Sequence, residues 1–591
     1  MNVIEKIKSS VATAIQHLYQ VEVLTKDIAI NTTKPEFEGD YTVVLFAFVK
    51  QFKKTPEAIG NELGNYLVTH NSDLFENFNV IKGFLNFTIC SKVWLNFLAE
   101  NYHNNQFGKT QTTGNKVMVE YASPNTNKPL HLGHLRNIFL GWGIAEILKT
   151  TGNEVVKTCI VNDRGIHICK SMIAWQLFAN GATPKSTHTK GDHFVGNYYV
   201  KFNDELKKQT ENLIATGKTK DEAEKEAPIM KATHQMLLDW EAGKPDVIEL
   251  WEKMNNWVYE GFDETYKKIG NDFDKIFYES NTYLLGKDLV KKGIDKKVFY
   301  TKEDGSVWID LTTEGLDEKI VQRKDGTSVY ITQDIGLAEQ RYNEFKANES
   351  IYVIGDEQNY HMKVLKLICQ KLQLPAADGI HHLSYGMVEL PTGKMKSREG
   401  TVVDADDIVE EMIKISKQKT EELGKVNDFT TEELNNLYRI IGLGALKFFL
   451  VRVDPKKKMI FNPEESIDFH GFTAPFIQYT HARIKSILRK NEIVTQAFNS
   501  DDLLPLEKDI IKHLEIFPSA LSEAAKELDP SKVAIYVFNL AQLFNSFYAQ
   551  HSIAQAEDEN KKQLRLHIAQ LTAQVIKTGM GVLGIEVPER M

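Results

Sequence analysis

Two histidines three residues apart are the first side chains in this sequence that suggest chemistry. His131-Leu132-Gly133-His134 follows an apolar run, VMVEY, and a loop, ASPNTNKP, and opens a segment with helical periodicity. The N–H groups and dipole at a helix start attract phosphate, and two imidazoles on one face can stabilise charge that develops on a phosphoryl group. The glycine leaves room for a ring or a ribose against the backbone. Taken alone, the motif is explained equally well by histidines that cap and pack a helix.

A basic, glycine-flanked segment lies far downstream and could act on the same phosphates. Residues 390–400, LPTGKMKSREG, follow the apolar run HHLSYGMV and include Lys394, Lys396 and Arg398. The glycines free the backbone, so the cations could close on a triphosphate while pyrophosphate departs. Alone, an exposed basic hairpin is the better explanation. The two segments together are far more specific and predict an enzyme that handles nucleotide phosphates.

Both segments lie in a region that alternates apolar strands with helices. We expect strands at VMVEY, EVVKTCIVND, TSVYITQ, SIYVIGD and HHLSYGMV, and helices at LHLGHLRNIFLGWGIAEILKT, DIGLAEQRYNEF and HMKVLKLICQKL. Such alternation predicts a Rossmann-type α/β fold with a doubly wound parallel sheet, which binds ligands at the carboxyl ends of its strands. From about 170 to 280 the strand pattern stops and Lys- and Glu-rich segments show helical periodicity, so we expect a helical insertion there.

The rest of the chain predicts three further regions. Residues 1–110 contain a helix, two apolar strands and a polar linker, which indicates a small α+β domain. The Rossmann domain is expected over 111–403 and a helical connecting region over 404–470. Residues 471–591 read as an all-α bundle.

Composition and charge exclude several classes of protein. The chain has 591 residues and a formal net charge of -9, which argues against a protein that coats nucleic acid indiscriminately. Its four cysteines show none of the spacings that hold zinc, so we predict no protein-bound metal and free thiols in a reducing cytoplasm. The start lacks the apolar run of a signal peptide, and the longest apolar stretch, Val43 to Val49, is far below the roughly 20 residues of a membrane span. We expect a cytoplasmic protein without a membrane partner.

The residues around both motifs resemble a known family. SPNTNKPLHLGHLR is similar to the "HIGH" signature of class I aminoacyl-tRNA synthetases, and GKMKSREG is similar to their "KMSKS" loop. GFLNF, the stretch from Asn162 to Gly165, GDHFVGNYYVKF, YITQDIG and GIEVPERM resemble arginyl-tRNA synthetases in particular, so the resemblance covers nearly the whole chain. The loop departs from the general pattern, because Ser397 stands where a second lysine is expected. We expect Lys128, just before the histidines, to supply that charge.

The resemblance implies a ligase that joins L-arginine to tRNA(Arg) in two steps. The arginine carboxylate attacks the α-phosphorus of ATP, which enters with Mg²⁺, and a terminal ribose hydroxyl of tRNA then attacks the arginyl adenylate. A monomer is expected. The catalytic residues implied are Lys128, His131, His134 and Lys394, and the ATP-binding residues are His131, Gly133, His134, Met387, Val388, Lys394, Met395, Lys396 and Ser397.

Selecting arginine means holding a flat, always charged guanidinium group with five N–H donors, which calls for carboxylates and an aromatic or amide lining. Candidates are expected at the carboxyl ends of strands, including the junction between a strand and a helix in VYITQD. Without the resemblance, a helix cap or a hydrogen-bonded sheet edge explains these residues better. By resemblance, Tyr330, Asp334 and Gln358 hold the guanidinium, Glu120 and Asn125 hold the amino-acid head group, and Ser123 also contacts arginine.

The carboxyl-terminal bundle carries aromatic, amide and basic side chains suited to RNA. Unpaired bases stack on aromatic rings and hydrogen-bond through their edges. The resemblance assigns this bundle to the anticodon and the amino-terminal domain to the tRNA elbow. For Phe544 and Phe547 individually, a place in the core is the better explanation. The tRNA-binding residues expected are Tyr479, Arg483, Asn545, Tyr548 and Met591.

Three other functions fit parts of the sequence. A class I synthetase for another amino acid, such as cysteine or glutamine, would share both motifs, although cysteine specificity calls for zinc ligands. A non-catalytic tRNA-binding relative would have no need of His131, His134 and Lys394. A small-molecule nucleotidyltransferase shares the histidine motif and the sheet, but it has no use for the terminal bundle.

Overall fold

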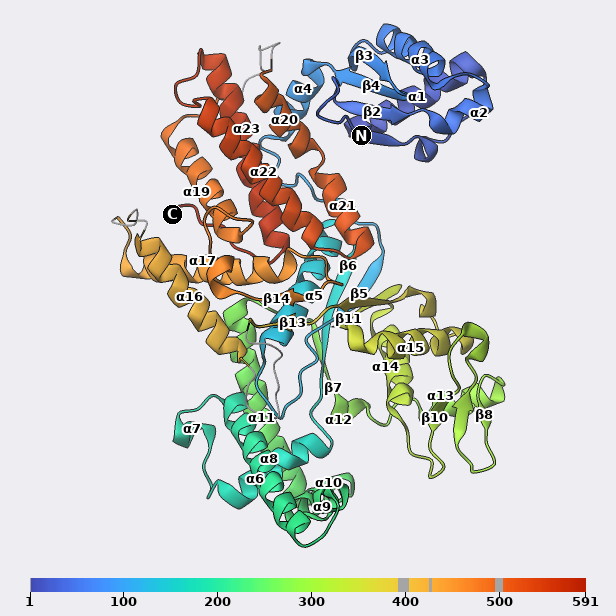
Figure 1. Cartoon of the computed structure of the whole chain (residues 1–591), viewed down its shortest axis with the longest axis vertical. Helices are drawn as coiled ribbons and strands as arrows, with labels where there is room; N and C mark the ends of the chain where they lie inside the picture. Colours follow the sequence, from blue (N-terminus) through green and yellow to red (C-terminus); the bar gives the residue numbers. More distant parts are fainter. Residues whose placement is uncertain (1, 392–402, 423, 425–427, 495–502) are drawn as a thin grey trace.

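A five-stranded parallel sheet at the centre of the molecule positions the histidine motif (Figure 1). The computed structural model describes residues 2–391, 403–422, 424, 428–494 and 503–591. Its strands are β5 (Lys116–Glu120), β6 (Glu154–Val161), β7 (Lys275–Tyr278), β11 (Glu349–Gly355) and β12 (Ile380–Tyr385). Their order is β12-β11-β5-β6-β7, so the chain winds one way from β5 and returns on the other side at β11. Ligands of doubly wound sheets bind at this switch point, and the fold class predicted from the sequence is confirmed.

Helices cover both faces of the sheet, and alternate residues of β5 belong to different cores. Val117 and Val119 pack in the core that contains α5 (Leu132–Thr150), whereas Met118 packs in a second core. The second core is formed by α14 (Tyr330–Phe345) and α15 (Asn359–Lys371). Burial on both faces explains the continuous apolar character of the strand.

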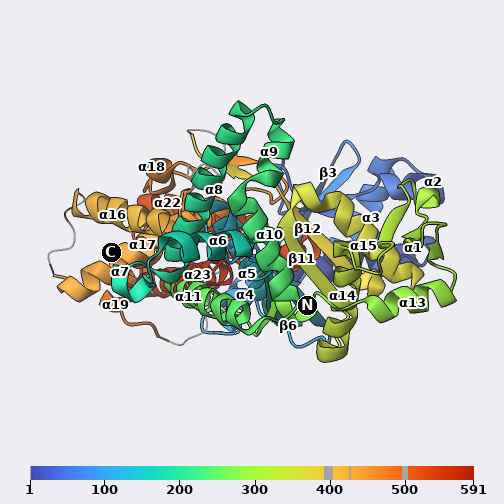
Figure 2. The same ribbon diagram turned by 90° about the horizontal axis from the view of Figure 1, so that it is seen from below.

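The expected helical insertion is present between β6 and β7. Its helices pack against one another below the sheet, as Figures 1 and 2 show from two directions. Strand β7 falls within the last residues of the stretch expected to be helical, so the insertion ends earlier than 280. The helices are α6 (Ile166–Phe178), α7 (Pro184–Thr187), α8 (Gly191–Ala215), α9 (Lys220–Glu226), α10 (Pro228–Glu241) and α11 (Pro245–Ile269).

The strand expected at TSVYITQ is wrong, because Tyr330 is already the first residue of α14. Ile331 and Ile335 lie one helical turn apart and are both buried in the second core, and that burial outweighs the strand preference of Val, Tyr, Ile and Thr. A small antiparallel sheet before α14 was also not expected. This lobe comprises α12 (Glu279–Thr282), α13 (Lys287–Asp295), β8 (Tyr300–Thr301), β9 (Val307–Ile309) and β10 (Lys319–Gln322).

The amino-terminal domain is an antiparallel sheet of order β1-β2-β4-β3 packed with helices. The apolar stretch at 43–49 is strand only at its start and then turns into short helices. Its elements are α1 (Val3–Tyr19), β1 (Ile30–Thr32), β2 (Tyr41–Val44), α2 (Val49–Phe52), α3 (Pro56–His70), β3 (Phe75–Ile81), β4 (Phe84–Ile89) and α4 (Ser91–Asn101).

The carboxyl-terminal third is helical, as predicted, apart from β14 (Met459–Ile460), which pairs with β13 (Val388–Glu389). Helix α17 is apolar over a length that could cross a membrane, but 72% of that window is buried, and it packs against α5, α16 and α19 as a core helix. Helices α21 and α23 also contact α5. The helices are α16 (Ala405–Glu422), α17 (Thr431–Val451), α18 (Pro463–Ser466), α19 (Ala474–Lys490), α20 (Pro505–Glu515), α21 (Phe517–Glu527), α22 (Ser531–Gln550) and α23 (Glu559–Val582).

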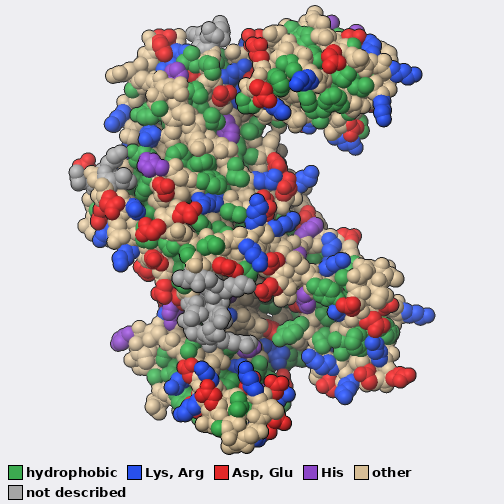
Figure 3. Space-filling view, in the orientation of Figure 1, with side chains coloured by type: hydrophobic (Ala, Val, Ile, Leu, Met, Phe, Trp, Pro, Cys, Tyr) green, Lys and Arg blue, Asp and Glu red, His purple; other side chains and the backbone are tan. Residues whose placement is uncertain are grey.

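The surface carries both signs of charge. Figure 3 shows Lys and Arg interspersed with Asp and Glu, together with a recess between the amino-terminal domain and the lobe of α13 and β8.

All four cysteines are unbridged, as expected, and three of them are buried.

Candidate active site

The two histidines cap helix α5 and lie against each other. His131 is the N-cap residue, and its Nδ1 accepts a hydrogen bond from the Gly133 N–H at 3.1 Å. The Nδ1 atom of His134 accepts from the His131 N–H, also at 3.1 Å, and the ring centroids are 3.9 Å apart. A Cβ on Gly133 would lie 3.0 Å from the His131 ring, so the room left by the glycine is used by that ring. The two histidines therefore cap the helix and also share one face of it. The structural and the chemical explanation of the motif are compatible with each other.

The capping bonds fix how each ring presents its proton. Burial, followed by the nearby charge of Lys128, lowers the pKa of His131 to about 4, and burial lowers the pKa of His134 well below its usual value. Both imidazoles are therefore neutral near pH 7 and carry one proton each. Because each Nδ1 accepts a backbone N–H, that proton lies on Nε2. The turn offers two Nε2–H donors.

Two buried side chains of α5 that we did not single out from the sequence hold this turn in place. The Arg136 guanidinium is completely buried and donates to the carbonyl oxygens of Gly386 at 2.5 Å and Lys457 at 2.8 Å. It also donates to Met387 O at 3.3 Å. Asn137 accepts from the Ala122 N–H at 2.5 Å and donates to a carbonyl of β11 at 2.7 Å. The helix is thereby joined to β11 and to the loop that follows β5.

The loop after β5 runs beside the end of β6. Ala122 and Ser123 have φ angles of 75° and 43°, in the left-handed region that non-glycine residues rarely adopt. Asn125 forms an isolated parallel bridge with Asn162, and the Asn162 N–H donates to Pro124 O at 2.9 Å. This brings the half-buried Ser123 and Asn125 next to the 162–165 segment.

A cavity of about 640 Å³ opens beside this loop. Asn125 and Tyr330, both expected to contact arginine, line it together with Arg164 and Glu279. Burial raises the pKa of the Glu279 carboxyl to about 7, against a smaller opposing effect of Arg164. Glu279 directly follows β7, a strand that the sequence did not reveal, so its position at a carboxyl end could not be recognised.

Three other expected arginine contacts are not among the described residues that line this cavity. Glu120 is buried in an ion pair with Arg341 of α14. Asp334 lies in the first turns of α14, not at a strand end, and its Oδ2 is 2.6 Å from His361 Nε2. Gln358 is exposed in a short 3-10 helix after β11. The expectation that every candidate ends a strand of the sheet is therefore wrong for Tyr330 and Asp334.

Only some of the remaining candidates for phosphate binding lie within the described residues. Lys394, Met395, Lys396 and Ser397 lie outside the described residues. Met387 and Val388 are described: the Met387 carbonyl accepts from Arg136, and the buried Val388 begins β13.

The tRNA candidates gather in the carboxyl-terminal bundle. Tyr479, Arg483, Tyr548 and Met591 line one cavity of about 580 Å³. The Arg483 guanidinium lies 4.9 Å from the Tyr479 ring centroid and 5.3 Å from that of Tyr548, and it donates to Asn545 at 2.5 Å. Asn545 also lines a neighbouring groove.

The two phenylalanines of the same helix have a different role. Phe544 and Phe547 are completely buried, which confirms their place in the core.

Three family descriptions match successive parts of the chain. "Arginyl tRNA synthetase N terminal domain" matches residues 5–89 and "tRNA synthetases class I (R), catalytic domain" matches 97–462. "DALR anticodon binding domain" matches residues 477–591.

Full-length relatives give the same result. An arginine–tRNA ligase of Bacteroides thetaiotaomicron is 51% identical over 598 residues, covering 100% of both chains. One of Porphyromonas gingivalis is 48% identical with the same coverage. Among solved structures, a Thermus thermophilus arginyl-tRNA synthetase superimposes with a TM-score of 0.81 and 26% identity, over 99% of each chain.

Proposed function

The chain belongs to the arginyl-tRNA synthetase family of class I, and from this premise we propose which of its residues carry out the family's reaction. It is an arginine–tRNA ligase, which converts ATP, L-arginine and tRNA(Arg) to AMP, diphosphate and L-arginyl-tRNA(Arg) through an arginyl adenylate in protein translation.

The proposed binding site for the phosphates of ATP is the histidine turn. His131 and His134 donate their Nε2–H groups to the phosphates and stabilise the charge that develops as the carboxylate attacks the α-phosphorus. The observation that carries this assignment is the capping geometry, in which both Nδ1 atoms are held by backbone N–H groups. Neutral donors stabilise developing charge and still let the products leave. Gly133 completes the turn beneath the nucleotide.

The cations complete the phosphate site. Lys128 lies close enough to lower the pKa of both histidines, which places its charge at the turn. Lys394 with Met395, Lys396 and Ser397 would contact the triphosphate of Mg–ATP from the second motif, and Met387 and Val388 would flank the nucleotide. Arg136 fixes the backbone of that last segment.

The arginine site is assigned to the cavity beside the loop after β5. Asn125 and Tyr330 line it, and Ser123 lies two residues before Asn125. We add Glu279, because a buried carboxyl on the cavity wall is a suitable partner for a guanidinium. Asp334 is assigned to the guanidinium through its position beside the cavity residue Gln333.

Two further residues are assigned to the arginine site on the resemblance of the sequence. Glu120, through its ion pair with Arg341, holds α14 near the head-group side. Gln358, exposed after β11, is assigned to the guanidinium side.

The tRNA is assigned to both ends of the chain. Residues 471–591 would read the anticodon through Tyr479, Arg483, Asn545, Tyr548 and Met591, since aromatic and guanidinium planes gathered at one cavity suit unpaired bases. Residues 1–110 would contact the elbow, 111–403 the acceptor end, and 404–470 connect them. We propose a monomeric enzyme of the cytoplasm.

Pyrophosphate exchange tests the assignment directly. Exchange of labelled pyrophosphate into ATP, measured with each amino acid in turn and with or without tRNA, should require both arginine and tRNA. His134→Ala should lower the turnover by roughly a hundredfold or more, the usual effect of losing one donor to a developing oxyanion. His188→Ala, which removes an exposed histidine at the end of α7, is the matched control and should leave turnover unchanged. Near-normal arginylation by a folded His134→Ala enzyme would refute the catalytic assignment.

A further inference from the structure

The segment GDHFVGNYYVKF begins helix α8 and has no role in the reaction as assigned above. Its two glycines are sites of close packing. Gly191 packs on the backbone of Trp257 in α11, so that a Cβ there would overlap the Trp257 carbonyl. A Cβ on Gly196 would lie 2.8 Å from Pro129 Cδ and 3.6 Å from the Cα of Lys128. One end of α8 therefore touches the backbone that leads directly into the histidine turn.

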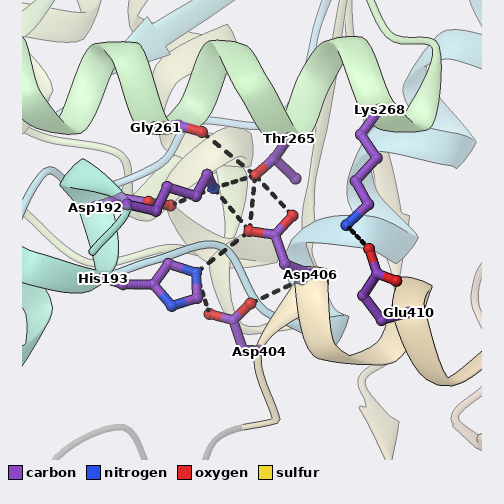
Figure 4. Close-up of polar contacts among 9 residues, drawn as sticks. Asp192, His193, Gly261, Thr265, Lys268, Asp404, Asp406 and Glu410 are labelled. Carbon is purple, nitrogen blue, oxygen red and sulfur yellow. Dashed lines mark hydrogen bonds and ion pairs between the residues drawn. The ribbon is translucent and has the colours of Figure 1, made fainter. Parts of the chain in front are cut away.

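Charged side chains at the start of α8 reach the start of α16. We call Lys190, Asp192, His193, Asp404 and Asp406 the α8 charge cluster (Figure 4). The Lys190 Nζ lies 3.1 Å from Asp192 Oδ2 and 2.7 Å from Asp406 Oδ2. The His193 Nε2 lies 3.3 Å from a carboxylate oxygen of Asp404 and 3.3 Å from one of Asp406.

The cluster is held by its own cations. Asp192, His193 and Asp406 could by their types bind a metal ion, but the Lys190 ammonium already lies within 3.1 Å of both carboxylates. Asp192 is completely buried, and hydrogen bonds to Asp404 and Asp406 raise the pKa of His193 to about 10. His193 is therefore a cation at neutral pH and forms a second positive centre between the carboxylates of Asp404 and Asp406. Removing one partner of a partly buried ion pair leaves the other charge without compensation, so these contacts hold the start of α8 against the start of α16.

Asp404 passes this contact on to the histidine turn. Its Oδ1 accepts the Asp406 N–H at 2.7 Å, as a cap of α16, while its backbone forms an antiparallel bridge with His131. The next N–H, that of Ala405, donates to Leu130 O at 3.0 Å. A side chain of α8 thus holds Asp404, and Asp404 lies along the backbone of Leu130 and His131.

We propose that Lys190 and His193 are positioning residues for adenylate formation, which hold the histidine turn through Asp404 and Asp406 while Gly196 seats Pro129 from the other side. This inference rests on the assignment of His131 and His134 to the phosphates of ATP. None of the described residues that line the cavity assigned to arginine belongs to the start of α8, so we expect this contact to affect the placement of the Nε2–H donors rather than arginine binding. A misplacement on the order of 1 Å at a reacting centre costs roughly a hundredfold in rate.

Four variants test the proposal by arginine- and tRNA-dependent pyrophosphate exchange. His193→Ala and Gly196→Ala should each lower kcat roughly tenfold or more, with the KM for arginine changed by less than about twofold. His193→Gln keeps an N–H donor toward the carboxylates and should recover part of the loss. Lys268→Ala is the matched control, because Lys268 of α11 and Glu410 form a 2.5 Å ion pair that also ends on α16 but involves neither α8 nor Asp404 (Figure 4). It should keep normal kcat.

The outcomes separate this inference from the assignment of the active site. If His134→Ala is inactive while His193→Ala and Gly196→Ala both keep normal kcat, the positioning role is refuted and the phosphate site stands. If His134→Ala is active, the phosphate site itself is wrong. If thermal denaturation shows that the fall in kcat disappears once the rate is divided by the folded fraction of the enzyme, the variants are only destabilised and the proposal is also overturned. Should His193→Ala fail to fold, His193→Gln and Gly196→Ala decide.

Discussion

At the scale of single residues, the histidine motif shows that a structural role and a chemical role can depend on the same atoms. Each Nδ1 is occupied by a backbone N–H, and this capping is what leaves Nε2 protonated and available. A side chain that only capped would work equally well as Ser, Thr, Asn or Asp, which are the usual N-cap residues. Two histidines supply capping and neutral donors at once.

Glu279 makes the arginine site sensitive to pH. Because burial raises its carboxyl pKa to about 7, the group is increasingly neutral as the pH falls below that value. A guanidinium pairs with the ionised form, so the KM for arginine should rise up to about tenfold between about pH 8 and about pH 6, where roughly a tenth of the group remains ionised. Glu279→Gln should raise the KM roughly tenfold or more and remove this pH dependence. Steady-state kinetics across this range measure both effects.

The control for this prediction is Glu241→Gln. Glu241 lines the same cavity but is exposed and paired with Arg164 at 3.2 Å, so its loss should leave the pH profile unchanged. An unchanged profile in Glu279→Gln would contradict the proposed contact with arginine.

Candidate residues that lie in a recognisable local motif could be identified from the sequence. Residues whose role depends on contacts with distant parts of the chain could not. His131 and His134 were identified from four consecutive letters and their place after a strand. Arg136 sits two residues later, but its partners are carbonyls around 386 and 457, which no local pattern links to it. Glu120 is the converse case, since it ends β5 as expected but its ion pair with Arg341, 221 residues away, could not be foreseen from the sequence.

At the scale of elements, buried polar side chains hold the first two turns of α5 in place. Arg136→Met should lower the free energy of unfolding by about 2–4 kcal/mol, because several buried carbonyls lose their donor together. It should also raise the KM for ATP, since the Met387 backbone is no longer held. Urea denaturation and exchange kinetics measure these changes.

Arg439→Met provides the comparison. Arg439 forms an exposed pair with Glu586 at 2.9 Å, and such surface pairs contribute about 0–1 kcal/mol. If both variants lost the same stability, the buried hydrogen bonds of Arg136 would not be what holds the helix.

Helices and strands were predictable where one pattern dominated. The strands β5, β6, β11 and β12 were expected because runs of apolar residues alternate with helices. The start of α14 was not, because VYIT favours a strand locally and only the burial of Ile331 and Ile335 in a core formed by distant segments makes it helical. β7 is four residues long and lies between a long helix and a lobe, so it gave little signal.

At the scale of the whole molecule, buried ion pairs as well as helix packing attach the amino-terminal domain to the carboxyl-terminal bundle. The Asp40 side chain is 6% exposed, and its two oxygens lie 2.8 Å from Lys508 and 3.1 Å from Lys512 of α20. Asp40 also accepts the Ile89 N–H at 2.8 Å. The order of the domains along the chain was predicted. The contact between the two ends of the chain was not, because it joins residues that lie far apart in the sequence. For example, Lys508 also donates a hydrogen bond to the carbonyl of Ile89, and these two residues are 419 positions apart.

Asp40→Asn should loosen this attachment by about 1–3 kcal/mol, the contribution of hydrogen bonds between charged groups. Faster proteolysis of the segment between α4 and β5 (residues 102–115) and a raised KM for tRNA, with kcat at saturating tRNA unchanged, are the expected results. Lys54→Ala, which breaks an exposed pair with Glu62 inside the same domain, should affect neither. Identical tRNA kinetics in the two variants would argue against a role of this attachment in tRNA binding.

Helix α5 begins at the histidine turn and is contacted by α17 of the connecting region and by α21 and α23 of the bundle assigned to tRNA. A ligand at one end of a shared rigid element can alter affinity at the other only as a coupling free energy, which is reciprocal. Any factor by which tRNA tightens ATP must therefore equal the factor by which ATP tightens tRNA, and one equilibrium measurement fixes the other.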